Sequence, residues 1–353
     1  MSLNHAQTEA VAHNKGPCMV LAGPGSGKTL TIAKRIEYLI MKHKVRPEEI
    51  LVITFTKYAA WEMKNRTRSI CGPSSYAVTF GTFHGIYYGI LKWAYRLNQS
   101  NLLSDEEKYR ILREILPGID WDQEPEADEE KDYLQELAIE IGNVKNNCMD
   151  IEEYEPVKYT TEKFRKLYRT YEETKKKYRK IDFEDMLIQC RDLFMKRPDI
   201  LKKWQEKFQY ILVDEFQDVN QAQYDVVRML AAPQDNLFVV GDDDQSVYGF
   251  RGAKPGIMME FMKDYPKARQ ILLDVNYRSS GYIVKGALRV IGNNKIRFEK
   301  KIEAFRKPDE TVHVQEVKDP VQEAEYVLER IREYREKGVS YTEMAVLYRT
   351  NVD

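Results

Sequence analysis

The chain has 353 residues, of which 43% are hydrophobic and 31% charged, and its formal net charge is −1. This length exceeds one typical domain and predicts two or three cores, and the composition is that of a globular protein, not a disordered or fibrous one. The near-neutral charge excludes binding of nucleic acid through overall positive charge, so any such binding must depend on local sites.

Cysteine spacing and hydropathy exclude further classes. The four cysteines, Cys18, Cys71, Cys148 and Cys190, are far apart and form no C-x-x-C pair. This argues against a zinc or iron–sulfur site and favours a reducing compartment. No apolar run approaches the roughly 18 residues of a membrane span, and the first residues form no apolar signal region. We therefore expect a cytoplasmic protein without a membrane segment.

The first predicted strand and helix flank a glycine-rich loop. The apolar run Cys18–Leu21 predicts a buried strand, and the pattern from Leu30 to Lys42 predicts a helix. Between them lies Ala22-Gly-Pro-Gly-Ser-Gly-Lys-Thr29, whose glycines let successive N–H groups point at an anion. Because the following helix adds the positive end of its dipole, the whole arrangement predicts a phosphate-binding loop.

Residues of this loop have expected roles. Lys28 is expected to reach the β- and γ-phosphates of a nucleoside triphosphate, and the Thr29 hydroxyl to bind Mg²⁺. The backbone around the phosphates is expected to come from Gly23, Gly25, Ser26 and Gly27. Upstream, the amide of Gln7 could pair with N6 and N7 of adenine, although an isolated glutamine is more often an ordinary surface residue.

The next elements continue the alternation. Ile50–Phe55 predicts a second buried strand and Thr56–Met63 a capped helix, while Ala77–His84 predicts a short strand that ends in a polar turn. Strands alternating with helices at this spacing predict an α/β fold with a parallel sheet and helices on both faces.

From about residue 86 to residue 207 the pattern changes. Strand signals are nearly absent and helical periodicity dominates, which predicts an all-helical insertion in the α/β domain. Residues 163–180 within it are rich in lysine, arginine and tyrosine. Such a helix could contact a nucleic-acid backbone or simply present a solvated face, and the sequence leaves both interpretations open.

Two carboxylates follow the next predicted strand. The apolar run Tyr210–Val213 leads directly into Asp214 and Glu215. Ligands of parallel sheets bind beyond the carboxyl ends of the strands, which is also where the phosphate loop lies. We expect Asp214 to belong to the Mg²⁺ shell and Glu215 to orient and deprotonate an attacking water.

A further predicted strand, Leu237–Asp242, leads into a loop of acidic, aromatic and glycine residues. Gln245, near the start of this loop, could contact the γ-phosphate. Three later residues offer flat surfaces on which bases could stack: Tyr248, Phe250 and Arg251. Packing in the interior is the alternative for the two aromatic residues.

The last part begins a new α/β pattern. A predicted strand at Gln270–Leu273 leads to Asn276-Tyr-Arg-Ser-Ser280, where Arg278 could reach across a cleft to phosphate. Further on, Thr311–Val317 and Met344–Tyr348 predict strands on either side of a helix at Val321–Lys337. One strand–helix–strand unit is too little for a complete domain, so we expect a piece of a longer protein.

These stretches agree in identity, order and spacing with one family. The sequence resembles the UvrD/Rep-like superfamily 1 DNA helicases over essentially its whole length. The resemblance lies in the phosphate-binding loop and in these stretches: Leu3–Gln7, Thr54–Thr56, Gly81–His84, Ile181–Leu187, Val213–Asp218, Gly241–Ser246, Tyr248–Ala253, Asn276–Ser279 and Val346–Asn351.

The resemblance implies a domain organisation and a reaction. A P-loop (RecA-like) domain would be built from residues 1–88 and 208–276, with a helical insertion at 89–207, and residues 277–353 would begin a second RecA-like domain. ATP would bind between the two domains with Mg²⁺, and its hydrolysis would drive 3′-to-5′ movement on single-stranded DNA and unwinding at duplex junctions, in DNA repair or replication.

The resemblance also implies residue roles. Gln7 would contact adenine, and Tyr277 would stack on it. Glu215 would be the catalytic base, Gln245 would couple the γ-phosphate to the DNA site, and Arg278 would be an arginine finger. The single-strand track would be lined by Phe55, His84, Tyr248 and Phe250, with Arg251 beside them.

Several positions depart from the family pattern. Ala22 replaces the leading glycine of the loop, Leu30 stands where an arginine near the adenine is usual, and Phe250 stands where tryptophan is frequent. Lys57-Tyr58 replaces a more usual Asn-Lys pair. Two later family motifs, which include a second arginine finger, are absent from the sequence. We therefore expect weak nucleotide binding, slow turnover and little unwinding by this chain.

Three other interpretations of these motifs are possible. The motor of a helicase–nuclease of the AddA/RecB kind would carry the same motifs. A non-catalytic DNA- or partner-binding relative would keep the fold, but intact Lys28, Thr29, Asp214 and Glu215 argue against it. A small-molecule kinase with a P-loop would have no use for the stretches Val239–Ala253 and Asn276–Ser279.

Overall fold

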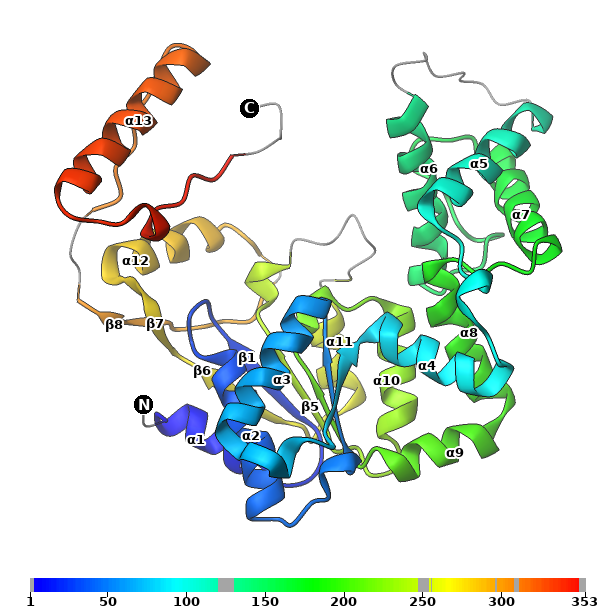
Figure 1. The fold of residues 1–353 in the computed structure, drawn as a ribbon, viewed down its shortest axis with the longest axis horizontal. Coiled ribbons are helices and arrows are strands. Elements are labelled where there is room, and N and C mark those ends of the chain that lie inside the picture. Colours follow the sequence, from blue (N-terminus) through cyan, green and yellow to red (C-terminus); the bar gives the residue numbers. More distant parts are fainter. Residues whose placement is uncertain are drawn as a thin grey trace. The chain divides into compact units, whose positions relative to one another are not determined.

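A computed structural model describes residues 3–119, 130–246, 254, 256–295, 297–307 and 311–348 (Figure 1). The chain forms two compact units, Met1–Lys307 and Pro308–Asp353. None of the helices in the described part of the chain is long and apolar enough to cross a membrane.

A six-stranded parallel sheet is the centre of the first unit, which confirms the predicted α/β fold (Figure 1). Its strands lie in the order β3-β2-β4-β5-β1-β6, and every neighbouring pair is parallel. Their bounds are β1 Cys18–Ala22, β2 Ile50–Thr54, β3 Thr79–Thr82, β4 Tyr210–Val213, β5 Leu237–Gly241 and β6 Arg269–Leu273.

Helices cover both faces of this sheet because successive strand side chains point to opposite sides. On β1, Cys18 and Val20 pack in a core with helices α1 His5–Ala12, α2 Lys28–Met41 and α3 Lys57–Cys71. Met19 and Leu21 pack in the other core. That core contains residues of α4 Phe83–Tyr95, α8 Phe183–Lys196, α9 Pro198–Lys207, α10 Gln221–Ala231 and α11 Ile257–Asp264. Burial on both faces explains why the four inner strands β1, β2, β4 and β5 are continuous apolar runs.

Threonine caps set the start of two helices. Thr56 Oγ1 accepts a hydrogen bond from Ala59 N at 3.0 Å, and α3 begins at the next residue, as the sequence predicted. Thr82 Oγ1 likewise accepts from Gly85 N at 3.1 Å. The predicted polar turn at His84 is therefore wrong: Thr82 caps α4, and His84 lies in its first turn.

The predicted all-helical insertion is confirmed for the described residues of that segment. Helices α5 Asp105–Ile115, α6 Glu130–Asn146 and α7 Thr161–Lys177 have a core of their own. The basic stretch 163–180 forms most of α7, but Lys175 within it is buried with 1% of its surface exposed. Part of this basic helix is thus interior structure.

A small two-stranded parallel sheet follows β6 in the first unit. It pairs β7 Val275–Ser280 with β8 Glu303–Arg306, and α12 Gly281–Ile291 connects and contacts both strands. Whether residues 277–353 begin a second RecA-like domain stays a prediction.

In the second unit the predicted helix is confirmed and the two predicted strands are wrong. Helix α13 spans Pro320–Glu336, with Asp319 Oδ1 accepting from Gln322 N at 2.9 Å. Residues 311–317 and 344–348 form no strand. A strand needs a neighbour to complete its ladder, and within 311–348 no segment pairs with either one.

Candidate functional site

The glycine loop between β1 and α2 is held in a conformation that requires glycine. Gly25 has φ 64° and Gly27 φ 85°, a left-handed region that side chains with a Cβ rarely adopt. A Cβ on Gly25 would lie 2.5 Å from Arg278 Cβ, and one on Gly27 would lie 2.7 Å from Gln7 Nε2. Gly27 caps α2 without a side chain, so the first N–H groups of the helix remain available to an anion.

Lys28, the first residue of α2, faces the carboxylates that follow β4. Its Nζ lies 2.7 Å from Glu215 Oε2, and 14% of its side chain is exposed. Glu215 has φ 49° and ψ 46°, a left-handed conformation that is uncommon away from glycine and frequent at functional sites. The fold thus brings the expected phosphate-binding lysine and the expected catalytic base into direct contact.

Asp214 is the more deeply buried of the two carboxylates. Its Oδ1 accepts a hydrogen bond from Glu215 N at 3.0 Å. Burial, and then the negative charge of Glu215, raises the pKa of Asp214 to about 6. A divalent cation would relieve this repulsion, and the Asp214 carboxylate with the Thr29 hydroxyl supplies the oxygen ligands that Mg²⁺ prefers.

Helix α1 is tied to the loop through Gln7. Gln7 Nε2 donates to Ser26 O at 2.9 Å, and Gln7 Oε1 accepts from Asn4 N at 3.0 Å. Asn4 caps the helix reciprocally, since its Oδ1 accepts from Gln7 N at 2.8 Å. Both polar atoms of the Gln7 amide have partners in the protein, so a contact with adenine requires an exchange of hydrogen bonds and stays a prediction.

Strand β7 contacts the other side of the loop. Tyr277 N donates to Gly25 O at 3.0 Å, and the Tyr277 hydroxyl accepts from Asn4 Nδ2 at 2.9 Å. The buried Asn276 accepts from the backbone N–H groups of Arg278 and Ser279, both at 2.8 Å. Tyr277 and Arg278 therefore lie beside the loop, as their expected roles require.

A buried glutamine connects the carboxylates to the end of β5. Gln217 Nε2 donates to Glu215 Oε2 at 3.0 Å, and Gln217 Oε1 accepts from Asp242 N at 2.9 Å. The Asp242 carboxylate in turn accepts from Gln245 Nε2 at 2.6 Å. A continuous chain of hydrogen bonds thus runs from Lys28 through Glu215, Gln217 and Asp242 to Gln245.

A buried lysine, Lys300, pairs with the aspartates that follow β5 at the end of this hydrogen-bond chain. Lys300 Nζ lies 2.5 Å from Asp242 Oδ1, 2.5 Å from Asp243 Oδ1 and 2.8 Å from Asp244 Oδ2. Burial alone would lower the pKa of Lys300, but the hydrogen bonds to the three carboxylates raise it. The three aspartates are close enough together to ligate a metal, yet the Lys300 ammonium already lies among them and Arg297 pairs with Asp244.

A cavity of about 470 Å³ lies between the α/β domain and the helical insertion. Phe55 and His84 line it from the sheet side, and Lys108 and Phe183 line it from the insertion side. The His84 and Phe183 rings meet edge to face with centroids 5.5 Å apart. Burial lowers the pKa of His84, so the ring is neutral at physiological pH. The cavity thus combines aromatic walls with charged side chains, namely Asp105, Lys108, Glu184 and Asp218.

Two family profiles match this chain. The UvrD/REP helicase N-terminal domain matches residues 3–266, and the UvrD-like helicase C-terminal domain matches residues 271–353.

The chain belongs to the UvrD/REP helicase family.

Curated relatives agree with this assignment. The chain is 40% identical over 362 residues to YjcD of Bacillus subtilis, covering 99% of this chain and 46% of YjcD. It is 36% identical over 357 residues to the ATP-dependent DNA helicase PcrA of Staphylococcus aureus, covering 99% of this chain and 48% of PcrA. The chain therefore spans about half the length of the curated relatives it matches.

The structure of this family member gathers most of the predicted site residues into two places. Around the loop lie Gln7, Gly23, Gly25, Ser26, Gly27, Lys28, Thr29, Asp214, Glu215, Tyr277 and Arg278. Gln245 connects to this group only through Asp242 and Gln217. Phe55 and His84 lie at the cavity. The predicted base-stacking residues Tyr248, Phe250 and Arg251 lie outside the described residues. The individual roles of all these residues stay predictions.

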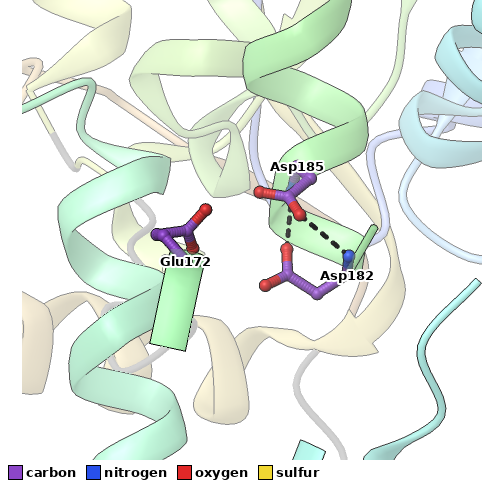
Figure 2. A group of neighbouring side chains, drawn as sticks. All are labelled: Glu172, Asp182 and Asp185. Carbon is purple, nitrogen blue, oxygen red and sulfur yellow. Dashed lines mark hydrogen bonds between the residues drawn. The ribbon is translucent and has the colours of Figure 1, made fainter. Parts of the chain in front are cut away.

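Three carboxylates in the insertion lie close enough to one another to bind a metal ion, but they form ion pairs with lysines instead (Figure 2). Glu172, Asp182 and Asp185 surround two lysines: Lys145 and Lys175 each lie within 2.8 Å of all three carboxylates. Burial would raise the pKa of Asp182, but the two lysines lower it well below its usual range. The ammonium groups thus occupy the place a cation would take, and the group is structural.

Sequence reasoning missed Gln217, Phe183 and Lys300. Gln217 lies in the same stretch as Asp214 and Glu215, and Phe183 follows a helix-capping aspartate, so both carried a local signal. Lys300 carried none, because its partners lie more than 50 residues earlier in the chain.

Proposed function

We propose that this chain is the nucleotide-hydrolysing and strand-binding part of an ATP-dependent DNA helicase. The observation that carries the proposal is the hydrogen-bonded chain from Lys28 through Glu215, Gln217 and Asp242 to Gln245. It links the loop suited to a triphosphate to the loop at which the resemblance puts DNA contacts. An enzyme that converts hydrolysis into movement needs such a link between its two sites.

Each residue of the nucleotide site has a chemical task in this proposal. The N–H groups of the loop and Lys28 hold the phosphates, and Thr29 and Asp214 hold Mg²⁺, which supplies charge neutralisation at the transferred phosphoryl group. Glu215 releases Lys28, with which it forms an ion pair in this structure, and binds an attacking water instead. It then orients and deprotonates this water. Gln245 and Arg278 approach the γ-phosphate from the β5 and β7 sides.

The strand site is the cavity between sheet and insertion. Phe55 and His84 offer flat faces to successive bases, and this contact accepts any sequence because every base has a π-face. For the whole protein we propose 3′-to-5′ unwinding of DNA in repair or replication. The direction rests on the family resemblance alone, whereas the helicase activity is also supported by the name of the relative PcrA, an ATP-dependent DNA helicase.

Two separate binding measurements test this proposal. A fluorescent ATP analogue with Mg²⁺ should bind the wild type and lose measurable affinity for Lys28→Ala. A labelled oligothymidine should bind both of these proteins, and Phe55→Ala should weaken it by about 1–3 kcal/mol, the contribution of one stacked base. Equal DNA affinity in the wild type and Phe55→Ala, or equal nucleotide affinity in the wild type and Lys28→Ala, would contradict the proposal.

A further inference from the structure

Helix α3, which follows Phe55 directly, presents unusually exposed aromatic side chains. Tyr58 is 70% exposed and Trp61 is 59% exposed, and Tyr76 just beyond the helix is 61% exposed. The Tyr58 and Trp61 rings lie against each other with centroids 5.9 Å apart. Large exposed aromatics that gather on one helix face point to an interaction surface, since single scattered ones would need no explanation.

These side chains form a stripe with an arginine in it. Helical spacing puts Tyr58, Trp61 and Arg68 on one face, away from the buried Met63. The Arg68 guanidinium lies over the Tyr76 ring, 4.8 Å from its centroid. We call Tyr58, Trp61, Arg68 and Tyr76 the α3 stripe. From Tyr58 to Arg68 it is about 15 Å long at 1.5 Å per helical residue.

The charge of α3 selects the kind of partner. The helix carries four basic residues, Lys57, Lys64, Arg66 and Arg68, against the single acidic residue Glu62, in a chain whose net charge is −1. Lys57 and Lys64 fall along the flank of the stripe next to Arg68, and neither has an ion pair among the described residues. Arg66, on the opposite flank, pairs with Glu62 at 3.5 Å. Unpaired cations beside flat aromatic faces match the phosphates and bases of a nucleic-acid strand.

The position of the stripe directly after a cavity residue also favours a nucleic-acid strand as its partner. Phe55 lines the cavity, Thr56 caps α3, and the stripe begins two residues later at Tyr58. At about 3.4 Å per stacked nucleotide, the stripe is long enough for roughly four of them. We propose that the α3 stripe is a second strand-binding surface, on which single-stranded nucleic acid continues after it leaves the Phe55 cavity. This inference rests on the proposed function.

The test compares short and long single strands on the intact chain. Fluorescence anisotropy would give affinities for a labelled oligothymidine of about 4 nucleotides, too short to occupy the cavity and the whole stripe together, and for one of about 20 nucleotides, which can reach both. We expect Trp61→Ala to weaken binding of the long strand by roughly 5- to 150-fold, the effect of one lost stack, and to leave binding of the short strand unchanged. Trp61→Phe should restore most of the affinity for the long strand.

Charge and surface controls complete the experiment. Lys64→Ala should make the salt dependence of long-strand binding shallower by about 0.7 in the logarithmic slope, the value for one phosphate contact to a single strand. Tyr95→Ala removes a similarly exposed aromatic residue from α4 and should leave both affinities unchanged. Trp61→Ala behaving like Tyr95→Ala would overturn the inference, and would leave a protein partner as the occupant of this face.

The same data separate this inference from the proposed function. If Phe55→Ala weakens both strands while Trp61→Ala weakens neither, the cavity binds DNA and the stripe does not. If the wild type binds neither strand, the proposed function fails and the inference with it.

Discussion

Asp214 and Glu215 are neighbours in sequence, but their surroundings differ and suit them to different roles. Glu215 reaches Lys28 and Gln217 and stays partly exposed, with 37% of its side chain accessible. Asp214 is 7% exposed, and burial together with Glu215 raises its pKa to about 6. A carboxylate kept at such an electrostatic disadvantage in the free protein is suited to gain a cation, so Asp214 favours metal binding at the expense of stability.

This disadvantage gives a prediction about stability and pH. Between about pH 4 and pH 6 the folded protein holds a proton on Asp214 that the unfolded chain has released, so the contribution of Asp214 to the free energy of unfolding falls as pH rises through this window. Above about pH 6 the ionised Asp214 lowers the free energy of unfolding by its full amount. Asp214→Asn should therefore stabilise the ligand-free protein at pH 7.5 by about 2–3 kcal/mol, because the pKa of Asp214 is raised from its usual 3.8 to about 6.

Chemical denaturation of both proteins at pH 4.5 and pH 7.5 checks this. The stabilisation by Asp214→Asn should shrink at the lower pH, whereas the exposed Asp150→Asn should show no such dependence. Added Mg²⁺ and ATP should raise the midpoint of the wild type and not that of Asp214→Asn. An Asp214→Asn protein that is less stable than the wild type at pH 7.5 would be incompatible with the burial and repulsion described here.

At the scale of elements, helix α8 fixes the insertion to the sheet. Its first turn lies at the cavity and carries Phe183, and its later residues Leu187 and Phe194 belong to the core under the sheet. Asp182 caps the helix, accepting from Asp185 N at 2.8 Å, and is itself held by Lys145 and Lys175. The buried charges thus determine where the helix starts and therefore where Phe183 stands.

Removing one of these charges should be costly. Lys175→Met leaves the buried carboxylates of Asp182 and Asp185 with one ammonium fewer, and breaking a buried ion pair costs about 3–5 kcal/mol. Lys176→Met changes an exposed lysine of the same helix and should alter the free energy of unfolding by less than about 0.5 kcal/mol. Urea denaturation of the two variants tests this difference, and equal stabilities would show that the ion network is not needed.

Local patterns in the sequence were enough for most elements of the first unit. The strands were predictable because Cys18–Ala22 and Leu237–Gly241 are apolar on both faces, and α3 because Thr56 caps it. The start of α4 could not be predicted, since only the hydrogen bond that Thr82 Oγ1 accepts decides whether His84 lies in a turn or in a helix. The strands expected at residues 311–317 and 344–348 failed because a strand depends on a neighbour that periodicity does not reveal.

At the scale of the whole first unit, one chain of hydrogen bonds runs from Lys28 in the phosphate loop to Gln245 after β5. Lys28, Thr29, Asp214 and Glu215 were predictable because each lies in a short motif after a strand. The link from these four residues to Gln245 could not be predicted. It passes through Gln217 to Asp242, and Asp242 is held by Lys300 from a distant part of the sequence. Contacts of that kind come from the fold and not from a local pattern.

The most direct test of this account is ATP hydrolysis by the chain, measured with and without single-stranded oligothymidine, for the wild type, Lys28→Ala and Phe55→Ala. We predict that DNA stimulates hydrolysis by the wild type, that Lys28→Ala abolishes hydrolysis under both conditions, and that Phe55→Ala loses the stimulation. Hydrolysis by the wild type that DNA does not change, or hydrolysis that persists in Lys28→Ala, would contradict the claim that these residues join a nucleotide site to a strand site.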